Sequence, residues 1–289
     1  MYEQISSNKR RTVVLLLAFL VLLWVFAYVM SKAFASPSLL FVIGIFSLTY
    51  AIFSYFAGAK MALAINRAKE ISKKDDPRLW RTVENLSITE GLPMPKVYIM
   101  DDPAPNAFAT GRSPEHSAVC ATTGLLQMMD DTELEGVMAH ELGHVKNLDM
   151  RVNTLAFALV GIISMIGDFF WHITFWGNND RREGNQLMYV LAIVAVILAP
   201  IAATLLQLAI SRRREYLADA TGALTTRYPD GLASALEKIG KKGSSLRRPN
   251  TATAHMFFAN PLRGGGVTNL FSTHPPVQAR IKALREMKL

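Results

Sequence analysis

The chain of 289 residues contains three long runs without a charged residue. They are Val13–Met30, Leu39–Ala59 and Leu187–Ile210, with 18, 21 and 24 residues. Because a helix needs about 20 apolar residues to cross a hydrocarbon core of about 30 Å, each run is predicted to be a transmembrane helix. The first run follows the basic residues 9–11, as a signal peptide would. It is long for such a peptide and lacks a clear small-x-small cleavage site, so a retained span is favoured.

A weaker apolar stretch covers residues 154–176. Its uncharged part, Leu155–Gly167, has only 13 residues, and the extension to Trp176 includes Asp168 and His172. Both polar side chains are costly in lipid unless they lie near an interface or face protein. Hydropathy alone therefore leaves open whether this stretch crosses the bilayer.

Residues 60–153, between the second apolar run and the weaker stretch, have the pattern of a soluble domain. Leu79, Val83 and Leu86 recur at helical spacing, which predicts a helix over residues 77–90. Three short strands are predicted at residues 96–100, 106–110 and 117–122. Asp130 and Glu133 have the spacing of a capping box and predict the start of the next helix.

The last segment, residues 211–289, is also predicted to be soluble. Helices are expected over residues 218–224 and 231–239 and after Pro276, where Val277, Ile281 and Leu284 share one face. Residues 240–250 are rich in Gly, Ser, Lys and Arg and predict a flexible linker.

Charge and composition narrow the class of protein. The net charge is +8, and the basic residues gather at residues 9–11, around residues 60–74 and at residues 212–214, beside the apolar runs. The positive-inside rule then places both termini and both soluble segments in the cytoplasm. No pattern of a nucleic-acid-binding module is present. The only cysteine, Cys120, excludes an internal disulfide framework and is expected to be a small buried apolar residue.

The candidate chemistry centres on the sequence His-Glu-Leu-Gly-His at residues 140–144. His140 and His144 are four residues apart, so on a helix both imidazoles face the same side and can bind one ion. Glu141 lies beside them, within reach of a water on that ion. This is the HExxH pattern of zinc metalloproteases, in which the glutamate acts as general base. Two surface histidines on an ordinary helix are the alternative.

Catalytic zinc sites use three protein ligands, and the strongest further candidates are in Glu215-Tyr216-Leu217-Ala218-Asp219. Glu215 and Asp219 are four residues apart on one helical face, so Glu215 could be the third ligand and Asp219 could orient a histidine. A solvated helix face is the alternative for this pair. If Glu215 does share an ion with His144, an even number of crossings must separate them, and residues 154–176 must span.

The order of these motifs resembles the HtpX-type membrane zinc metallopeptidases, bacterial relatives of the CAAX prenyl proteases. The resemblance rests on HELGH, on EYLAD directly after an apolar run, on residues 106–111 (NAFATG) and on residues 273–276 (THPP), and it covers nearly the whole chain. It implies a gluzincin-type domain with one zinc ion per chain, bound by His140, His144 and Glu215, with Glu141 as base. It also implies that Asp219 supports a histidine ligand, that Asn106 lies on a substrate-binding edge strand and that His274 lies near the oxyanion.

The predicted fold is a multi-span helical membrane protein with a zincin-like α+β domain, mostly helical with a small sheet. Residues 1–59 form a basic tail and two spans, residues 60–153 the first catalytic segment, residues 154–210 two further spans, and residues 211–289 the second catalytic segment. The expected activity is zinc-dependent cleavage of damaged or misfolded membrane proteins at the cytoplasmic face of the bacterial inner membrane. Processing of lipidated peptides and a non-enzymatic zinc-binding membrane scaffold are the alternatives.

Overall fold

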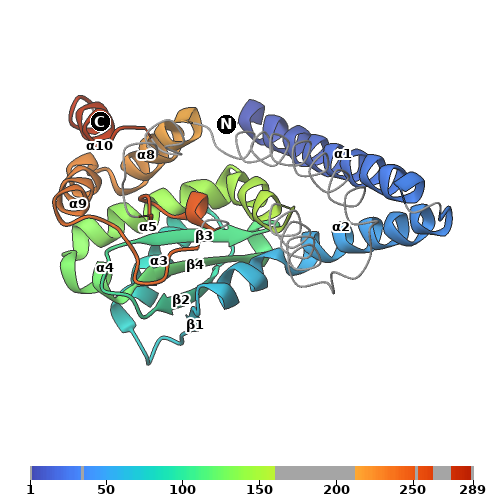
Figure 1. Cartoon of the computed structure of the whole chain (residues 1–289). Coiled ribbons are helices and arrows are strands. Elements are labelled where there is room, and N and C mark those ends of the chain that lie inside the picture. The colour runs from blue at the N-terminus through green and yellow to red at the C-terminus, as the bar shows by residue number, and fades with distance from the viewer. Residues whose placement is uncertain (1, 34–35, 160–211, 251–252, 263–274, 288–289) are drawn as a thin grey trace. The chain divides into compact units, whose positions relative to one another are not determined.

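The computed structural model describes residues 2–33, 36–159, 212–250, 253–262 and 275–287 (Figure 1). These residues form two compact units. Unit 1 contains residues 2–9, 59–154 and the described residues from 212 onward, and unit 2 contains residues 10–58 and 155–159. The predicted spans at 154–176 and 187–210 lie outside the described residues, except for residues 154–159, which are helical.

Two long apolar helices, α1 (Tyr2–Ala33) and α2 (Ser38–Ile65), account for most of unit 2. Both are long and apolar enough to cross a membrane, over Ser6–Tyr28 and Leu40–Ile65. Phe19 and Tyr50 pack together with ring centroids 6.4 Å apart, and the Tyr50 hydroxyl donates to the Ala158 carbonyl at 2.9 Å. Other large apolar side chains point outward, among them Val21, Phe41 and Ile45, which are 63%, 67% and 69% exposed. Such exposure of apolar side chains suits contact with lipid.

The N-terminal residues differ from the expected basic tail. Helix α1 begins at Tyr2, so residues 2–12 form its first turns. The sequence of these residues contains no glycine or proline that would break a helix, and helix formation propagates readily from an established segment. The basic residues 9–11 therefore lie on the helix rather than before it.

Unit 1 is built around a four-stranded mixed sheet with the order β1-β2-β4-β3. The strands are β1 (Lys69–Glu70), β2 (Lys96–Met100), β3 (Ala107–Gly111) and β4 (Ser117–Thr122). β2 and β4 are parallel, whereas β3 is antiparallel to β4 and lies at the edge of the sheet. The predicted strands over 96–100 and 117–122 are confirmed, and the third begins one residue later than expected.

Helix α3 (Pro77–Glu90) has the predicted bounds because both of its ends are capped. The Asp76 carboxylate accepts from the Leu79 N–H, and Gly91 ends the helix in the left-handed conformation at φ 65°. Its buried side chains join the core beneath α5 (Asp131–Lys146). The predicted capping box at Asp130 and Glu133 is present and starts α5, which lies across one face of the sheet (Figure 1).

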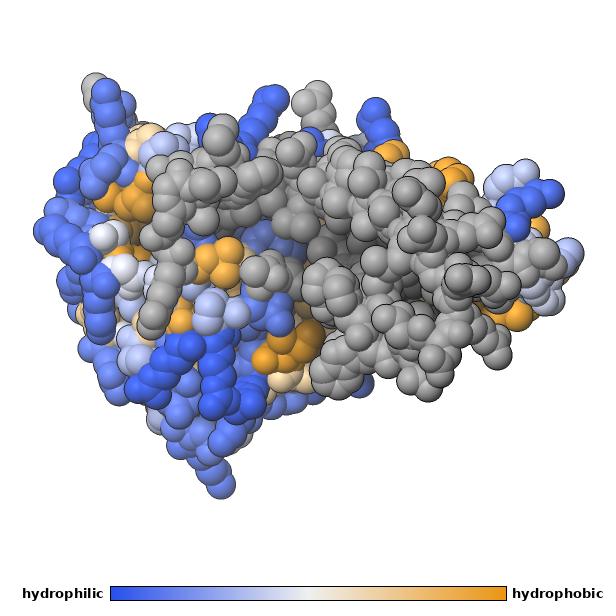
Figure 2. Space-filling model, viewed as in Figure 1, coloured by the Kyte–Doolittle hydropathy of each residue, from blue (hydrophilic) through white to orange (hydrophobic). Residues whose placement is uncertain are grey.

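Three helices of the last segment complete unit 1: α8 (Arg212–Thr226), α9 (Pro229–Lys242) and α10 (Val277–Arg285). The short helix α4 (Thr123–Met128) follows β4, and 3-10 turns lie at Pro114–His116 and Ala254–Met256. On the face seen in Figure 2, the described surface over the sheet and α9 is mainly hydrophilic. The described fold is thus mostly helical with a small mixed sheet, as predicted.

The expected linker over residues 240–250 begins later than predicted. Helix α9 continues to Lys242, and the following chain is held in place by hydrogen bonds. The Ser244 hydroxyl donates to the Asn260 carbonyl at 2.6 Å, and the Arg247 N–H donates to Asp102 Oδ2 at 2.9 Å. Leu246 is also buried. The composition of this stretch is polar, but its backbone groups find partners in distant loops.

Candidate metal centre

Helix α5 places His140, Glu141 and His144 in the interior of unit 1. All three are buried, although polar residues of this kind are usually exposed. The spacing of one helical turn brings the two histidine rings to 4.7 Å between centroids, with their Nε2 atoms 3.1 Å apart. The alternative of two surface histidines is therefore wrong.

Helix α8 brings Glu215 to the same point. One of its oxygens lies 3.8 Å from His140 Nε2 and the other lies 3.5 Å from His144 Nε2. One ligand atom from each of the three residues lies within 4.8 Å of the others. The close approach of α8 to α5 depends on Gly222, where an added Cβ would meet the backbone nitrogen of His140 at 2.9 Å. Glu215 is also buried, so it is not part of a solvated helix face.

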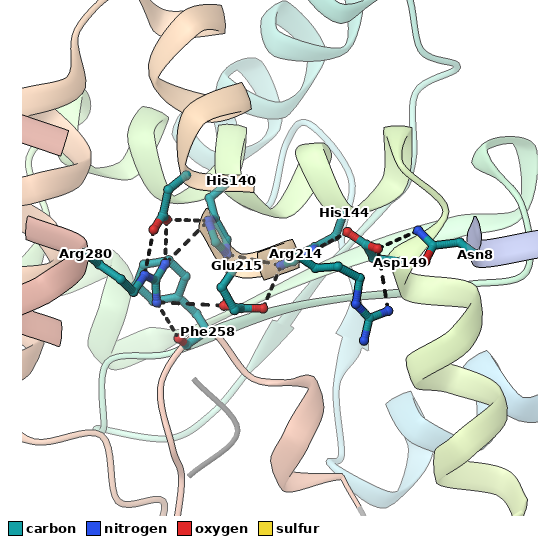
Figure 3. A network of polar contacts seen from close by, with 9 residues as sticks. Asn8, His140, His144, Asp149, Arg214, Glu215, Phe258 and Arg280 are labelled. Atoms are coloured by element: carbon teal, nitrogen blue, oxygen red, sulfur yellow. Dashed lines mark hydrogen bonds and ion pairs between the residues drawn. The ribbon is translucent and has the colours of Figure 1, made fainter. Parts of the chain in front are cut away.

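Each histidine presents its other ring nitrogen to a separate carboxylate (Figure 3). His140 Nδ1 lies 2.9 Å from Asp219 Oδ1, and His144 Nδ1 lies 3.2 Å from Asp149 Oδ2. A proton on each Nδ1 leaves both Nε2 atoms as acceptors, aimed at each other and at Glu215. When both rings are neutral, three electron-pair donors face one point, and this arrangement fits a bound cation.

The two histidines differ in protonation. Burial lowers the pKa of His140 to about 4, so its ring is neutral at pH 7. Burial also opposes protonation of His144, but the hydrogen bond to Asp149 and the charge of Glu215 outweigh it and raise the pKa of His144 to about 9. The second proton of His144 lies on Nε2, which faces His140 and Glu215, and a metal ion bound there would displace it.

Glu141 lies between the two histidines on α5, with its carboxyl group fully buried. Burial raises the pKa of Glu141 to about 7, and the Glu215 charge adds to this effect, while His144, Arg280 and the backbone of Ala109 act in the opposite direction. A carboxyl group with a pKa near neutrality can both accept and release a proton at physiological pH.

Arg280, on the last helix, is a member of the site that sequence reasoning missed. Its guanidinium group is 1% exposed and donates to both oxygens of Asp219, at 2.8 and 2.7 Å. It also lies 3.9 Å from Glu215 and over the Phe258 ring at 4.8 Å. The position of Arg280 four residues after Pro276 gave no signal, because its carboxylate partner Asp219 is 61 residues away in the sequence.

Asn106 comes directly before the edge strand β3 and is completely buried. Its amide NH₂ donates to the Ala259 carbonyl at 2.8 Å, and its carbonyl accepts from the Ala259 N–H at 3.1 Å. The Phe258 N–H donates to the Ala107 carbonyl at 2.8 Å, and Phe257 pairs with Phe108 as an antiparallel bridge. Residues 257–259 therefore lie along the outer edge of β3.

The other histidines do not join the cluster in the described part of the chain. His116 is exposed and bonds to Ser113, and the His255 ring contacts the Asn153 carbonyl at 3.0 Å. His274 lies outside the described residues.

A buried helix that carries HExxH, with a carboxylate delivered by a later helix, is the arrangement of metallopeptidase active sites. The comparison with protein families agrees: residues 73–288 match peptidase family M48, and the chain belongs to this family. It is a metallopeptidase associated with membranes, and the resemblance noted from its motifs is confirmed.

Curated relatives extend over the whole chain. A protease HtpX homolog of Tropheryma whipplei (strain Twist) is 51% identical over 288 residues, which cover 99% of this chain and 98% of the relative. A protease HtpX homolog of Dictyoglomus thermophilum is 43% identical over 289 residues, which cover 99% and 94% of the two chains. The crystal structure of S. mikatae Ste24p is similar in fold, with a TM-score of 0.52 and 18% identity over 98% of this chain and 67% of that one.

Proposed function

We propose that this protein is a zinc-dependent endopeptidase, with one zinc ion per chain held by His140, His144 and Glu215. The observation that carries the proposal is the convergence of these three buried ligand atoms within 4.8 Å, with Glu141 adjacent on α5. Two imidazole nitrogens and one carboxylate suit a catalytic zinc, whereas a structural zinc is usually held by four ligands with cysteines among them. The one cysteine, Cys120, is buried on β4 with its pKa raised by burial, as expected of a small apolar residue.

When bound, zinc would polarise the scissile carbonyl and make a water molecule more acidic. Glu141 would take the proton from the attacking water and pass it to the leaving amine. Asp219 and Asp149 would hold the two histidines in the required tautomer. Arg280 would keep Asp219 ionised, because its positive charge lowers the pKa of Asp219 despite the opposing effect of burial.

We propose that an extended substrate peptide adds to the edge of β3 through main-chain hydrogen bonds. Asn106 and the Ala107 carbonyl face this edge, and residues 257–259 bind both in the structure. A peptide in this position would have to displace that segment. His274 remains a candidate for stabilising the oxyanion, an effect worth about 3 kcal/mol in comparable sites.

Two contacts within unit 1 support a site at the membrane surface, and the basic residues 9–11 and 212–214 favour the cytoplasmic side. Asp149 follows the HELGH helix and contacts both Asn8, ahead of the first apolar run, and Arg214, four residues after the last one. The start of the first run and the end of the last run would then lie on the same side of the bilayer as the metal centre. This requires an even number of crossings between them. Glu215 follows Ile210 by five residues, about 7.5 Å along a helix. This position favours membrane proteins as substrates, and the resemblance to HtpX-type peptidases adds that they are damaged or misfolded proteins of the bacterial inner membrane.

The proposal is tested with Glu141→Gln in the purified full-length protein. A model substrate is prepared in a membrane-tethered and in a soluble form, and cleavage is measured with zinc and with a chelator. Wild type should cleave the tethered form faster and only with metal, and Glu141→Gln should lose activity while it keeps bound zinc. Glu135→Gln, an exposed glutamate on the same helix, is the matched control and should remain active. Full activity of Glu141→Gln would contradict the proposed mechanism.

A further inference from the structure

We infer that Asn8, near the start of the chain, is a positioning residue for the metal centre. It acts through Asp149, the carboxylate that contacts His144. The inference rests on the proposed function, in which His144 is a metal ligand. Asn8, on the first turns of α1, thus contacts a carboxylate that itself contacts a proposed metal ligand.

The contacts form a continuous chain of buried polar groups (Figure 3). The Asn8 amide NH₂ donates to Asp149 Oδ1 at 2.7 Å, and the other oxygen of Asp149 lies 3.2 Å from His144 Nδ1. Asn8, Asp149 and His144 are 1%, 0% and 8% exposed. Water therefore cannot easily replace the Asn8 amide as a donor to Asp149.

Asn8 also fixes the backbone that carries Asp149. The same amide NH₂ donates to the Asn147 carbonyl at 2.7 Å, so Asn8 bridges both sides of the turn after α5. Between these two contacts lies Leu148, whose φ of 59° is unfavourable for a residue with a branched side chain. A backbone in this conformation persists only where its surroundings hold it, and the Asn8 bridge is such a restraint.

The buried negative charge of Asp149 is stabilised by both Asn8 and Arg214. A buried carboxylate must be satisfied by donors, and Arg214 supplies a positive charge at the longer distance of 3.5 Å. Arg214 directly precedes Glu215, the third proposed ligand. Asp149 thus joins the N-terminal turns, the end of α5 and the beginning of α8, and Asn8 provides the shortest of these contacts. Loss of the Asn8 amide should let Asp149 and the His144 ring move.

The test compares the metal affinity of purified full-length variants. Each protein is stripped of metal and titrated with zinc in competition with a chromophoric chelator. Asn8→Ala should bind zinc about tenfold more weakly, the lower end of the range for partners of metal ligands. Asn8→Asp should be weaker still, because it places a second carboxylate against Asp149. Ser6→Ala, an exposed position on the same turn of α1, is the control and should bind as wild type does.

A second measurement separates positioning from general stability. The visible absorption of the cobalt-loaded protein reports the ligand geometry, and it should change in the Asn8 variants and not in Ser6→Ala. An unchanged cobalt spectrum and zinc affinity in Asn8→Ala, even with a lower unfolding temperature, would overturn the inference. If Asn8→Ala does not fold, Asn8→Ser, which keeps a donor, is judged by the same two readouts. A wild-type protein that binds neither zinc nor cobalt would overturn the proposed function itself.

Discussion

Arg280 donates two hydrogen bonds to the carboxylate of Asp219, and both side chains are buried. Asp219 in turn accepts from His140 Nδ1. Arg280, on α10, therefore contacts the proposed metal ligand His140 through Asp219. Removal of one partner from a buried ion pair leaves an uncompensated charge and costs about 3–5 kcal/mol. The Arg280–Asp219 pair therefore links the stability of unit 1 to the geometry of its site.

Arg280→Ala should lower the free energy of unfolding by about 3 kcal/mol and weaken metal binding, because Asp219 would be buried without its counter-charge. Denaturant unfolding and zinc competition measure the two effects. Arg285→Ala is the control on the same helix, since Arg285 pairs with Glu237 at the exposed surface. Its effect should be below about 1 kcal/mol. Equal effects of the two substitutions would contradict the role assigned to Arg280.

Gly222→Ala should separate α8 from α5. The added Cβ would meet backbone atoms of His140 and Ala139 at 2.9 and 3.2 Å, and backbone atoms cannot move aside as a side chain can. We expect a loss of about 2 kcal/mol of stability from overpacking and weaker zinc binding, since Glu215 would move away from both histidines.

Gly143→Ala is the matched control for this prediction. Gly143 lies within HELGH itself, but its added Cβ would meet Ala218 and Thr221 at 3.4 Å or more, which is an ordinary contact. Because alanine favours a helix by about 1 kcal/mol over glycine, the variant should be as stable as wild type or slightly more stable. Strong loss of zinc from Gly143→Ala, with none from Gly222→Ala, would show that the helix contact is wrongly described.

Asn106→Ala should destabilise unit 1 even without substrate. The amide of Asn106 satisfies both the N–H and the carbonyl of Ala259, and its loss would leave these groups unpaired at a cost of about 2 kcal/mol. Thermal unfolding checks this, with Asn85→Ala, at an exposed position on α3, as the control. A variant with unchanged stability and a raised KM would indicate that Asn106 serves substrate alone.

The sequence predicted those features that depend on neighbouring residues. The bounds of α3 follow from Asp76 and Gly91 at its ends, and the start of α5 follows from the Asp130 capping box. HELGH and the Glu215 helix were recognisable for the same reason, because their spacing is that of one helical turn.

The sequence could not predict contacts between distant segments. Asn8 and Asp149 are separated by 141 residues, and Asn106 and Ala259 by 153. Nothing in the local pattern distinguishes these residues from exposed ones, since their burial results from tertiary packing. The polar stretch over residues 240–250 illustrates the same limit, because its hydrogen bonds to Asn260 and Asp102 are not visible in its composition.

The most direct test of the metal centre is the zinc content of purified wild type and Glu215→Gln, measured by elemental analysis after dialysis. Glu237→Gln, at the exposed surface of α9, serves as the control. With His140, His144 and Glu215 as the ligands, wild type and the control should each retain one zinc ion per chain, and Glu215→Gln should retain almost none. Full zinc content in Glu215→Gln would contradict the site described here.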